Sequence, residues 1–477
     1  MKDYKIATDI RRAKKDYSDT YDAMKWLTPK ETSQAAEKRE LLLNTIFNHH
    51  AAVPEWRFSG TKLFNHAISP GCNLCGQGDW SCLFINGICN AKCFYCPSNQ
   101  NEKGQPVTST VEFSSPNDYA DYINAFDIKG VSFSGGEPFM TFDRVLLYLK
   151  TLREKVSHPL YIWMYTNGLL VTKDKLMALK DHGLDEIRFD ISANKYHLDA
   201  LKKAVGIIPC VTVEIPAIPE DLPITKPLMK ELYETGVNYL NLHQIRCTTF
   251  NIGSLIKRGY TFVNGPAVTV METEMAALEL IRHALETNID LPINYCSFTY
   301  RHQFQRAGAQ RRNALRIKAE HEDITPTGHI RALSILGTQT QIGSIHEHLL
   351  SKVGNLSLWS LSKRGEQLFF NADLWPFIDF SNVRLKVVYS GTSLKSSVSF
   401  RYFFKEIVLN KRKKIVIERH SKHKGIFFEG VQIREFGATF IRSGDHFPES
   451  IESKITLRIF DEINGWEHFS PGLAHYF

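Results

Sequence analysis

Residues 82–100, with the sequence CLFINGICNAKCFYCPSNQ, contain the pattern that decides the fold. A short apolar run leads directly into three cysteines, Cys89, Cys93 and Cys96, at the spacing CxxxCxxC. The run predicts a buried strand, and the cysteines predict a tight loop at its carboxyl end. Three thiolates on a four-iron cluster leave one iron open to a further ligand. A zinc loop or a chance cluster is the alternative for this spacing alone.

Apolar runs and amphipathic segments alternate from residue 82 to about 295. The expected strands are residues 82–88, 131–134, 160–166, 186–192, 209–215 and 238–243, with a further one at 291–296. Helices of this length between strands require crossover connections, so we expect an α/β fold with a parallel sheet that is closed or partly closed as a barrel. Chemistry in such folds lies at the carboxyl ends of the strands.

The bulk composition indicates a multidomain globular protein. The chain has 477 residues, of which 43% are hydrophobic, and its net charge of +7 does not by itself indicate nucleic-acid binding. We expect no membrane segment and no secretion signal, because no apolar run has the required length. A cytoplasmic protein follows, in which the nine cysteines stay reduced and free for metal binding.

Two further motifs follow the next two predicted strands. SGGEP occupies residues 134–138, and MYTNG occupies residues 164–168. Together with the CxxxCxxC loop they resemble the radical S-adenosylmethionine (SAM) superfamily over roughly residues 80–300. The resemblance implies a partial parallel (β/α)6 barrel, a 4Fe-4S cluster on the three loop cysteines, and bound SAM. It also implies an oxygen-sensitive enzyme that reductively cleaves SAM to a 5′-deoxyadenosyl radical.

The resemblance also implies which residues contact the cofactor. Tyr95 corresponds to the family position near the adenine, and Glu137 would supply the negative charge that the methionine ammonium needs. The glycines before Glu137 would allow a close backbone approach. The expected cofactor-binding residues are Tyr95, Gly135, Gly136, Glu137, Asn167, Arg188, Asp190 and Ser192.

Each of these assignments has a structural alternative. Tyr95 could be only a packed ring, SGGEP could be an ordinary turn, and Arg188 could form a structural ion pair with Asp190. Because side chains alternate along a strand, Arg188, Asp190 and Ser192 could also face the barrel interior together.

A second group of cysteines lies upstream of the loop. Cys72, Cys75 and Cys82 lie close together in the sequence, and Cys296 ends the last predicted strand. Since a cylindrical sheet brings its first and last strands together, Cys296 is the expected fourth ligand of a second iron-sulfur cluster or of a zinc ion. The segments GCNLCG, IPAIPE and NYCS resemble a branch of the superfamily related to pyruvate formate-lyase activating enzymes.

The composition changes on either side of the expected barrel. Residues 1–70 predict a helical N-terminal extension, and residues 71–324 contain the cysteine-rich segment and the barrel. Residues 325–477 are rich in aromatic and β-branched runs, which predicts a mostly β domain with a role in substrate recognition.

The leading hypothesis is a radical SAM enzyme that abstracts hydrogen from an unidentified substrate, either a peptide, a protein or a small molecule. A low-potential donor such as flavodoxin or ferredoxin would supply its electron. A second hypothesis is an iron-sulfur redox or scaffold protein that acts by binding a partner. A nucleic-acid-modifying enzyme is the third, because residues 411–424 carry seven Lys and Arg and one acid, although a charged hairpin edge is the favoured explanation.

Overall fold

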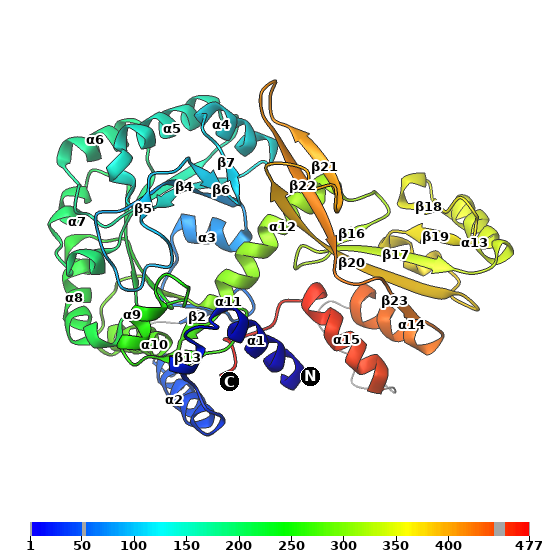
Figure 1. The fold of residues 1–477 in the computed structure, drawn as a ribbon, viewed down its shortest axis with the longest axis horizontal. Helices are drawn as coiled ribbons and strands as arrows, with labels where there is room; N and C mark the ends of the chain where they lie inside the picture. Colours follow the sequence, from blue (N-terminus) through cyan, green and yellow to red (C-terminus); the bar gives the residue numbers. More distant parts are fainter. Residues whose placement is uncertain (1, 50–53, 443–453, 477) are drawn as a thin grey trace. The chain divides into compact units, whose positions relative to one another are not determined.

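A computed structural model describes residues 2–49, 54–442 and 454–476, which divide into two compact units (Figure 1). The barrel unit comprises residues 2–305, 409–411 and 471–477, and the C-terminal unit comprises residues 306–408 and 412–470. The division follows Gln305, whereas the sequence placed it after residue 324. The difference is helix α12 (Arg306–Ile317), which packs on the sheet of the C-terminal unit, where Thr392 Oγ1 donates to the Gln310 carbonyl at 3.1 Å.

The barrel unit is built on a run of parallel strands. They follow one another across the sheet in the order β4 (Trp80–Ile88), β8 (Gly130–Gly135), β9 (Tyr161–Thr166), β10 (Glu186–Phe189), β11 (Cys210–Pro216), β12 (Tyr239–His243) and β15 (Ile293–Cys296). Each strand therefore pairs with the next parallel strand of the run, as right-handed crossovers produce. The prediction of a parallel α/β partial barrel is confirmed.

Helices surround these strands in the barrel unit (Figure 1). They are α4 (Pro116–Ala125), α5 (Phe142–Lys155), α6 (Lys173–Asp181), α7 (Asp199–Ala204), α8 (Leu222–Thr235) and α10 (Met271–Glu286). Helix α5 shows why they pack on the sheet: Val145, Tyr148, Leu149 and Leu152 are buried and recur at helical spacing on one face.

A short helix, α3 (Pro70–Gln77), lies inside the ring of strands (Figure 1). Pro70 takes the first helical position, and the Ser69 hydroxyl caps the helix by accepting from Cys72 N at 3.1 Å. A Cβ on Gly71 would lie 2.5 Å from Arg188 Nη2 and 2.9 Å from Glu186 Oε2. Residue 71 must therefore be small, because the helix packs directly on side chains of β10.

The N-terminal extension is part of the barrel unit and is not purely helical. Besides α1 (Lys2–Asp16) and α2 (Pro29–Phe47), it contributes β1 (Lys25–Trp26), which pairs with β13 (Thr261–Val263). It also contributes β2 (Glu55–Arg57) and β3 (Lys62–Phe64), which extend the barrel sheet beyond β15. The expectation of a helical N-terminal extension is therefore corrected. The strands were missed because they are too short to give a periodic signal in the sequence.

The C-terminal unit contains an antiparallel sheet of eight strands in the part that the structure describes. Its central order is β18 (Trp359–Leu361), β19 (Gln367–Phe370), β17 (Ile330–Leu336), β20 (Arg384–Lys395), β22 (Lys414–Ser421) and β21 (Phe403–Val408). Strands β16 (Asp323–Ile324) and β23 (Ile426–Phe428) pair with β17 and β20, and helices α13 (Gln339–Lys352), α14 (Val431–Phe436) and α15 (Lys454–Glu467) complete the unit. The mostly β prediction is confirmed. None of the described helices has the length and apolarity needed to cross a membrane.

Candidate functional site

The CxxxCxxC loop begins where β4 ends. Cys89 N donates to the Gln100 carbonyl at 3.2 Å, and Cys96 N donates to the Cys93 carbonyl at 3.1 Å, so the loop is tightly closed. All three thiols are free and half-buried. Burial, followed by the nearby Asp190 charge, raises the pKa of Cys93 to about 12, which a bound metal ion would reverse.

The donor set fits an iron-sulfur cluster, because three soft thiolates on one loop are the ligands that such clusters use. In the part of the chain that the structure describes, no three His, Cys, Asp or Glu side chains converge on one metal-sized point, and this includes the loop cysteines. The fit therefore rests on the chemistry and placement of the donors.

The SGGEP segment ends β8 and lies against the start of the cysteine loop. Glu137 N donates to the Ile88 carbonyl at 2.7 Å, and Gly136 N donates to the Asn86 carbonyl at 2.9 Å. A Cβ on Gly136 would lie 1.9 Å from the Ile88 oxygen, and one on Gly135, whose φ is +117°, would lie 2.1 Å from the Asn86 oxygen. The close approach of β4 therefore requires glycine at both positions. This packing alone explains the two glycines, without a bound ligand.

The Glu137 carboxylate is buried and holds two strand ends together. Its Oε1 accepts from Thr166 Oγ1 at 2.9 Å and from Phe139 N at 3.1 Å, and its Oε2 accepts from Asn167 N at 2.7 Å. Burial raises the pKa of Glu137 to about 7, against the effect of these hydrogen bonds. The carboxylate thus fixes SGGEP to the end of β9.

Asn167 connects the end of β9 to the cysteine loop. Its Nδ2 donates to Asn90 Oδ1 at 2.8 Å and approaches Cys89 Sγ at 3.7 Å. Gly168 follows with φ of +80°, a left-handed turn that glycine adopts without strain. The three motifs predicted from sequence therefore meet at the carboxyl ends of β4, β8 and β9.

Tyr95, Asp190 and Ser192 form a hydrogen-bonded triad. Tyr95 OH donates to Asp190 Oδ2 at 2.8 Å and lies 2.6 Å from Ser192 Oγ, which donates to Asp190 Oδ1 at 2.6 Å. Burial raises the pKa of Asp190, although both hydroxyls act to lower it. The triad fixes the cysteine loop to the end of β10.

The expected strand at residues 186–192 is shorter in the structure. β10 ends at Phe189, and residues 191–194 form a 3₁₀ turn. Asp190 and Ser192 therefore follow the strand, and the expected alternation does not extend from Arg188 to Ser192. Arg188 lies apart from the other two residues.

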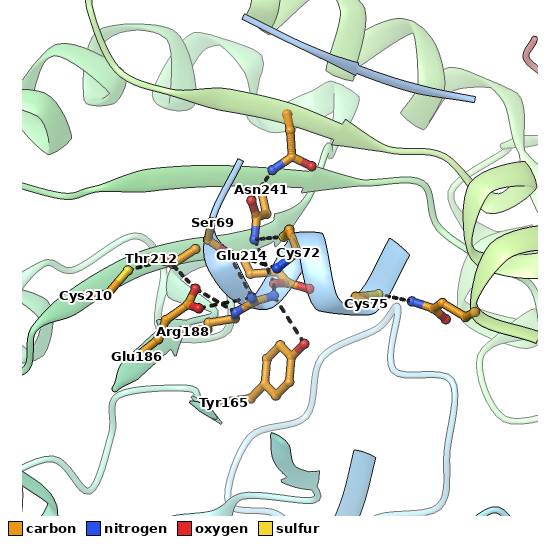
Figure 2. A network of polar contacts seen from close by, with 12 residues as sticks. Ser69, Cys72, Cys75, Tyr165, Glu186, Arg188, Cys210, Thr212, Glu214 and Asn241 are labelled. Atoms are coloured by element: carbon orange, nitrogen blue, oxygen red, sulfur yellow. Dashed lines mark hydrogen bonds and ion pairs between the residues drawn. The ribbon is translucent and has the colours of Figure 1, made fainter. Parts of the chain in front are cut away.

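Arg188 belongs to a buried polar network inside the barrel unit (Figure 2). Nε and Nη2 donate to the two oxygens of Glu186 at 2.9 and 3.2 Å, and Nη1 donates to Glu214 Oε2 at 2.8 Å. The remaining donors reach Ser69 Oγ at 3.0 Å and Tyr165 OH at 3.4 Å. These contacts occupy all five guanidinium N–H groups, so the predicted cofactor contact is not supported, and the alternative ion pair with Asp190 is wrong.

The upstream cysteines separate into two places. Cys72 and Cys75 lie on α3. The charge of each thiolate would act on that of Cys296. Cys82 instead pairs across β4 and β8 with Ser132 and lies against Ser134 as well. The structure therefore gives Cys82 other neighbours than the remaining three predicted ligands, and among the described residues those three do not meet at one metal-sized point.

Sequence reasoning missed two residues that support the site. Asn86 Nδ2 donates to the Glu137 carbonyl at 3.0 Å and to Thr141 Oγ1 at 2.7 Å, and Asn251 Nδ2 donates to the Tyr95 carbonyl at 2.9 Å. Asn86 is the one amide side chain within the apolar run of β4, which was an available signal. Asn251 is distant in sequence and gives none.

Comparison with known proteins identifies the central part of the barrel unit. Residues 83–222 match the model of the radical SAM superfamily. A protein of Methanocaldococcus jannaschii named "Putative glycyl-radical enzyme activating enzyme" is 28% identical over 59% of this chain and 77% of its own length. A Haemophilus influenzae protein with the same descriptive name is 30% identical over 30% of this chain, and the match spans 54% of that protein.

Solved structures give weaker likenesses. Streptococcus suis SuiB is 15% identical with a TM-score of 0.33, over 57% of this chain and 56% of that one. Methylornithine synthase is 9% identical with a TM-score of 0.33, over 56% of this chain and 82% of that one. Neither likeness carries an argument about function.

Proposed function

The chain contains a radical SAM domain at residues 83–222, the domain of an enzyme, and on this premise we propose that Cys89, Cys93 and Cys96 hold a 4Fe-4S cluster beside bound SAM. When bound, the cluster supplies the electron that breaks the C5′–S bond of SAM, which yields methionine and a 5′-deoxyadenosyl radical that abstracts hydrogen from the substrate. Asn167 and the SGGEP backbone would border the cofactor, because they meet the loop at the same strand ends.

One observation carries the proposal: the three predicted motifs form a single hydrogen-bonded group. Glu137 bonds to the end of β9 through Asn167 N, and Asn167 bonds to the cysteine loop through Asn90. Tyr95 ties the same loop to Asp190 at the end of β10. Residues that share only a structural role would not need to gather at the carboxyl edge where barrel enzymes place their chemistry.

We propose a protein substrate, because two relatives are named as activating enzymes for glycyl-radical enzymes. The radical would abstract hydrogen from that partner, and a low-potential donor such as flavodoxin or ferredoxin would reduce the cluster. The radical SAM domain favours this enzyme over a redox or scaffold protein, and no finding supports a nucleic-acid substrate.

The test is anaerobic incubation of reconstituted protein with dithionite and SAM, followed by measurement of 5′-deoxyadenosine and methionine. We expect slow formation of both products, and we expect Cys93→Ala to abolish it while the circular dichroism spectrum stays unchanged. Cys210→Ala is the matched control, since Cys210 belongs to neither cysteine group and should retain activity. No product from the wild-type protein, or full activity in Cys93→Ala, would reject the proposal.

A further inference from the structure

Six cysteines of the barrel unit are not used by the proposed function, and three of them lie on α3 and at the end of β15. Cys72 and Cys75 lie on α3 three residues apart, so their side chains share one face of the helix. Cys296 ends β15. We propose that these three residues bind a second metal centre through their thiolates, separate from the CxxxCxxC loop.

Polar contacts hold α3 against the strand and turn that neighbour Cys296. Gln305 Nε2 donates to Cys75 Sγ at 2.8 Å, and Asn241 Nδ2 donates to Cys72 Sγ at 3.5 Å (Figure 2). Tyr300 OH also donates to the Cys72 carbonyl at 3.3 Å. Side-chain N–H groups directed at sulfur are the outer contacts that stabilise metal-bound thiolates.

The buried ring of Tyr300 lies between α3 and the strand pair that contains Cys296. Tyr300 OH contacts the Cys72 carbonyl on α3, and Lys62 Nζ, on the residue that pairs with Cys296 across β3 and β15, lies 4.4 Å from the centre of the Tyr300 ring. Both elements that carry the three cysteines therefore border the same side chain.

A buried cation provides independent support for a negative centre at this point. Lys62 lies directly opposite Cys296 in the β3–β15 pairing and is 1% exposed. Its Nζ donates to Asn294 Oδ1 at 2.7 Å and lies 4.4 Å from the centre of the Tyr300 ring. No ion pair among the described residues includes Lys62, so two of its three N–H groups lack a described acceptor.

The carboxylate of Glu214 belongs to the same hydrogen-bond network, but it does not accept a hydrogen bond from Lys62. Asn294 donates to Asn241, and Asn241 Nδ2 donates to Glu214 Oε2 at 3.0 Å, so two amides separate Lys62 from Glu214. Glu214 is already paired with Arg188 at 2.8 Å. A buried ammonium is costly without a close negative partner, and metal-bound thiolates of Cys75 and Cys296 would provide one.

The proposed ligand set differs from the one that the sequence predicted. Cys82 is replaced, because it lies against Ser132 and Ser134. The strand register places His243 beside Cys296, so an imidazole is available as a fourth ligand. A zinc ion with four ligands and an iron-sulfur cluster with three both form negative thiolate centres, and the experiment distinguishes them.

The experiment starts from a full-length triple variant, Cys89→Ala, Cys93→Ala and Cys96→Ala, which lacks the thiols of the proposed SAM cluster. Its result is therefore independent of the proposed function. After anaerobic reconstitution, iron, sulfide and zinc are measured per chain. About four irons and four sulfides would identify a cluster, and about one zinc without sulfide would identify a zinc site. Absence of both metals would overturn the proposal.

Further substitutions in this variant test the ligands. Cys72→Ala or Cys296→Ala should reduce the bound metal at least tenfold, and Cys82→Ala is the matched control that should leave it unchanged. Loss of metal in the Cys82→Ala control, with retention in Cys296→Ala, would overturn the ligand set. Circular dichroism identifies any variant that has not folded, and Cys75→Ser then replaces it.

Lys62→Met tests the charge argument with a different measurement. If the centre is an iron-sulfur cluster, its reduction potential should fall, because a buried positive charge stabilises the reduced, more negative form. If the centre is zinc, the metal should be lost faster to a chelator. An unchanged potential or an unchanged rate of loss would contradict the pairing of Lys62 with the centre.

Discussion

At the scale of single residues, the site depends on groups that hold the strand ends in place. Glu137 shows this best, because its buried carboxylate accepts three hydrogen bonds from Phe139, Thr166 and Asn167. A carboxylate with these partners is a positioning group for the loops around the cofactor. Its family role toward the methionine ammonium stays a prediction.

We predict that Glu137→Gln weakens SAM binding and leaves the iron content of the loop cluster unchanged. The new amide N–H₂ would face a hydrogen-bond donor, and loss of a bond to a charged group costs about 1.5–3 kcal/mol, which corresponds to roughly a tenfold to hundredfold weaker affinity. Equilibrium binding of SAM to the reconstituted protein measures the effect. Glu234→Gln, on the exposed face of α8, is the control, and equal affinity in both variants would remove Glu137 from the site.

Site residues that belong to recognisable motifs could be identified from the sequence. Cys89, Gly136 and Asn167 fall in motifs, and the structure brings their segments together. Arg188 was misassigned because the predicted strand continued past Phe189, and the buried carboxylates that engage it come from β10 and β11. Lys62 could not be recognised, because only the pairing of β3 with β15 shows that this lysine is buried.

At the scale of elements, the parallel strands were predicted to within two residues at most ends. Buried parallel strands are continuous apolar runs, and these stand out between amphipathic helices. The β2–β3 hairpin was missed, because its strands have three residues each and its turn uses Phe58 and Ser59 at positive φ. Long-range pairing stabilises such short strands, and no local pattern encodes it.

The link between β16 and β17 supplies a pH-dependent element in the C-terminal unit. His329 is buried, its Nδ1 lies 2.9 Å from Thr327 Oγ1, and Thr325 Oγ1 donates to the Trp466 carbonyl of α15 at 2.6 Å. Burial, followed by the charges of Lys422 and Arg306, lowers the pKa of His329 to about 3. The folded state therefore disfavours the protonated ring.

We predict that the C-terminal unit loses stability as the pH falls below 6.5. A histidine with a lowered folded-state pKa contributes stability above the unfolded value, and this is lost as the pH falls toward the folded value. At pH 5 the loss is about 2 kcal/mol. Hydrogen exchange of β17, corrected for intrinsic rates, measures it in the wild-type protein, in His329→Gln and in the exposed control His348→Gln. If the free energy measured by hydrogen exchange changed with pH to the same extent in all three proteins, the assignment of the effect to His329 would be contradicted.

At the scale of the whole molecule, the last residues belong to the barrel unit. Arg39 Nη1 donates to the Ala474 carbonyl at 2.8 Å, its guanidinium lies 4.2 Å from the centre of the Tyr476 ring, and Tyr476 OH donates to Glu274. Removal of the C-terminal unit by simple truncation would therefore also remove contacts of the barrel. A deletion must keep residues 471–477.

We predict that the C-terminal unit governs substrate choice and is not needed for SAM cleavage. A variant in which a flexible linker replaces residues 306–470, and with them the three barrel-unit residues 409–411, should keep its loop cluster and cleave SAM slowly, but it should lose acceleration by substrate. Iron content and 5′-deoxyadenosine formation are the measurements. The matched variant that ends at Gln305 should melt at a lower temperature. Loss of the cluster from the soluble linked variant would show that the two units do not divide the function in this way.

The most direct test of the central claim is the electron paramagnetic resonance spectrum of the loop cluster before and after SAM is added. The variant Cys72→Ala, Cys75→Ala and Cys296→Ala removes the thiols of the proposed second centre and keeps the CxxxCxxC thiols, so one reduced cluster should give the signal. If that cluster has an iron open to SAM, the g-values should shift when SAM binds, and Cys93→Ala in the same background should give no cluster signal. A reduced cluster whose spectrum is unchanged by saturating SAM would contradict the account.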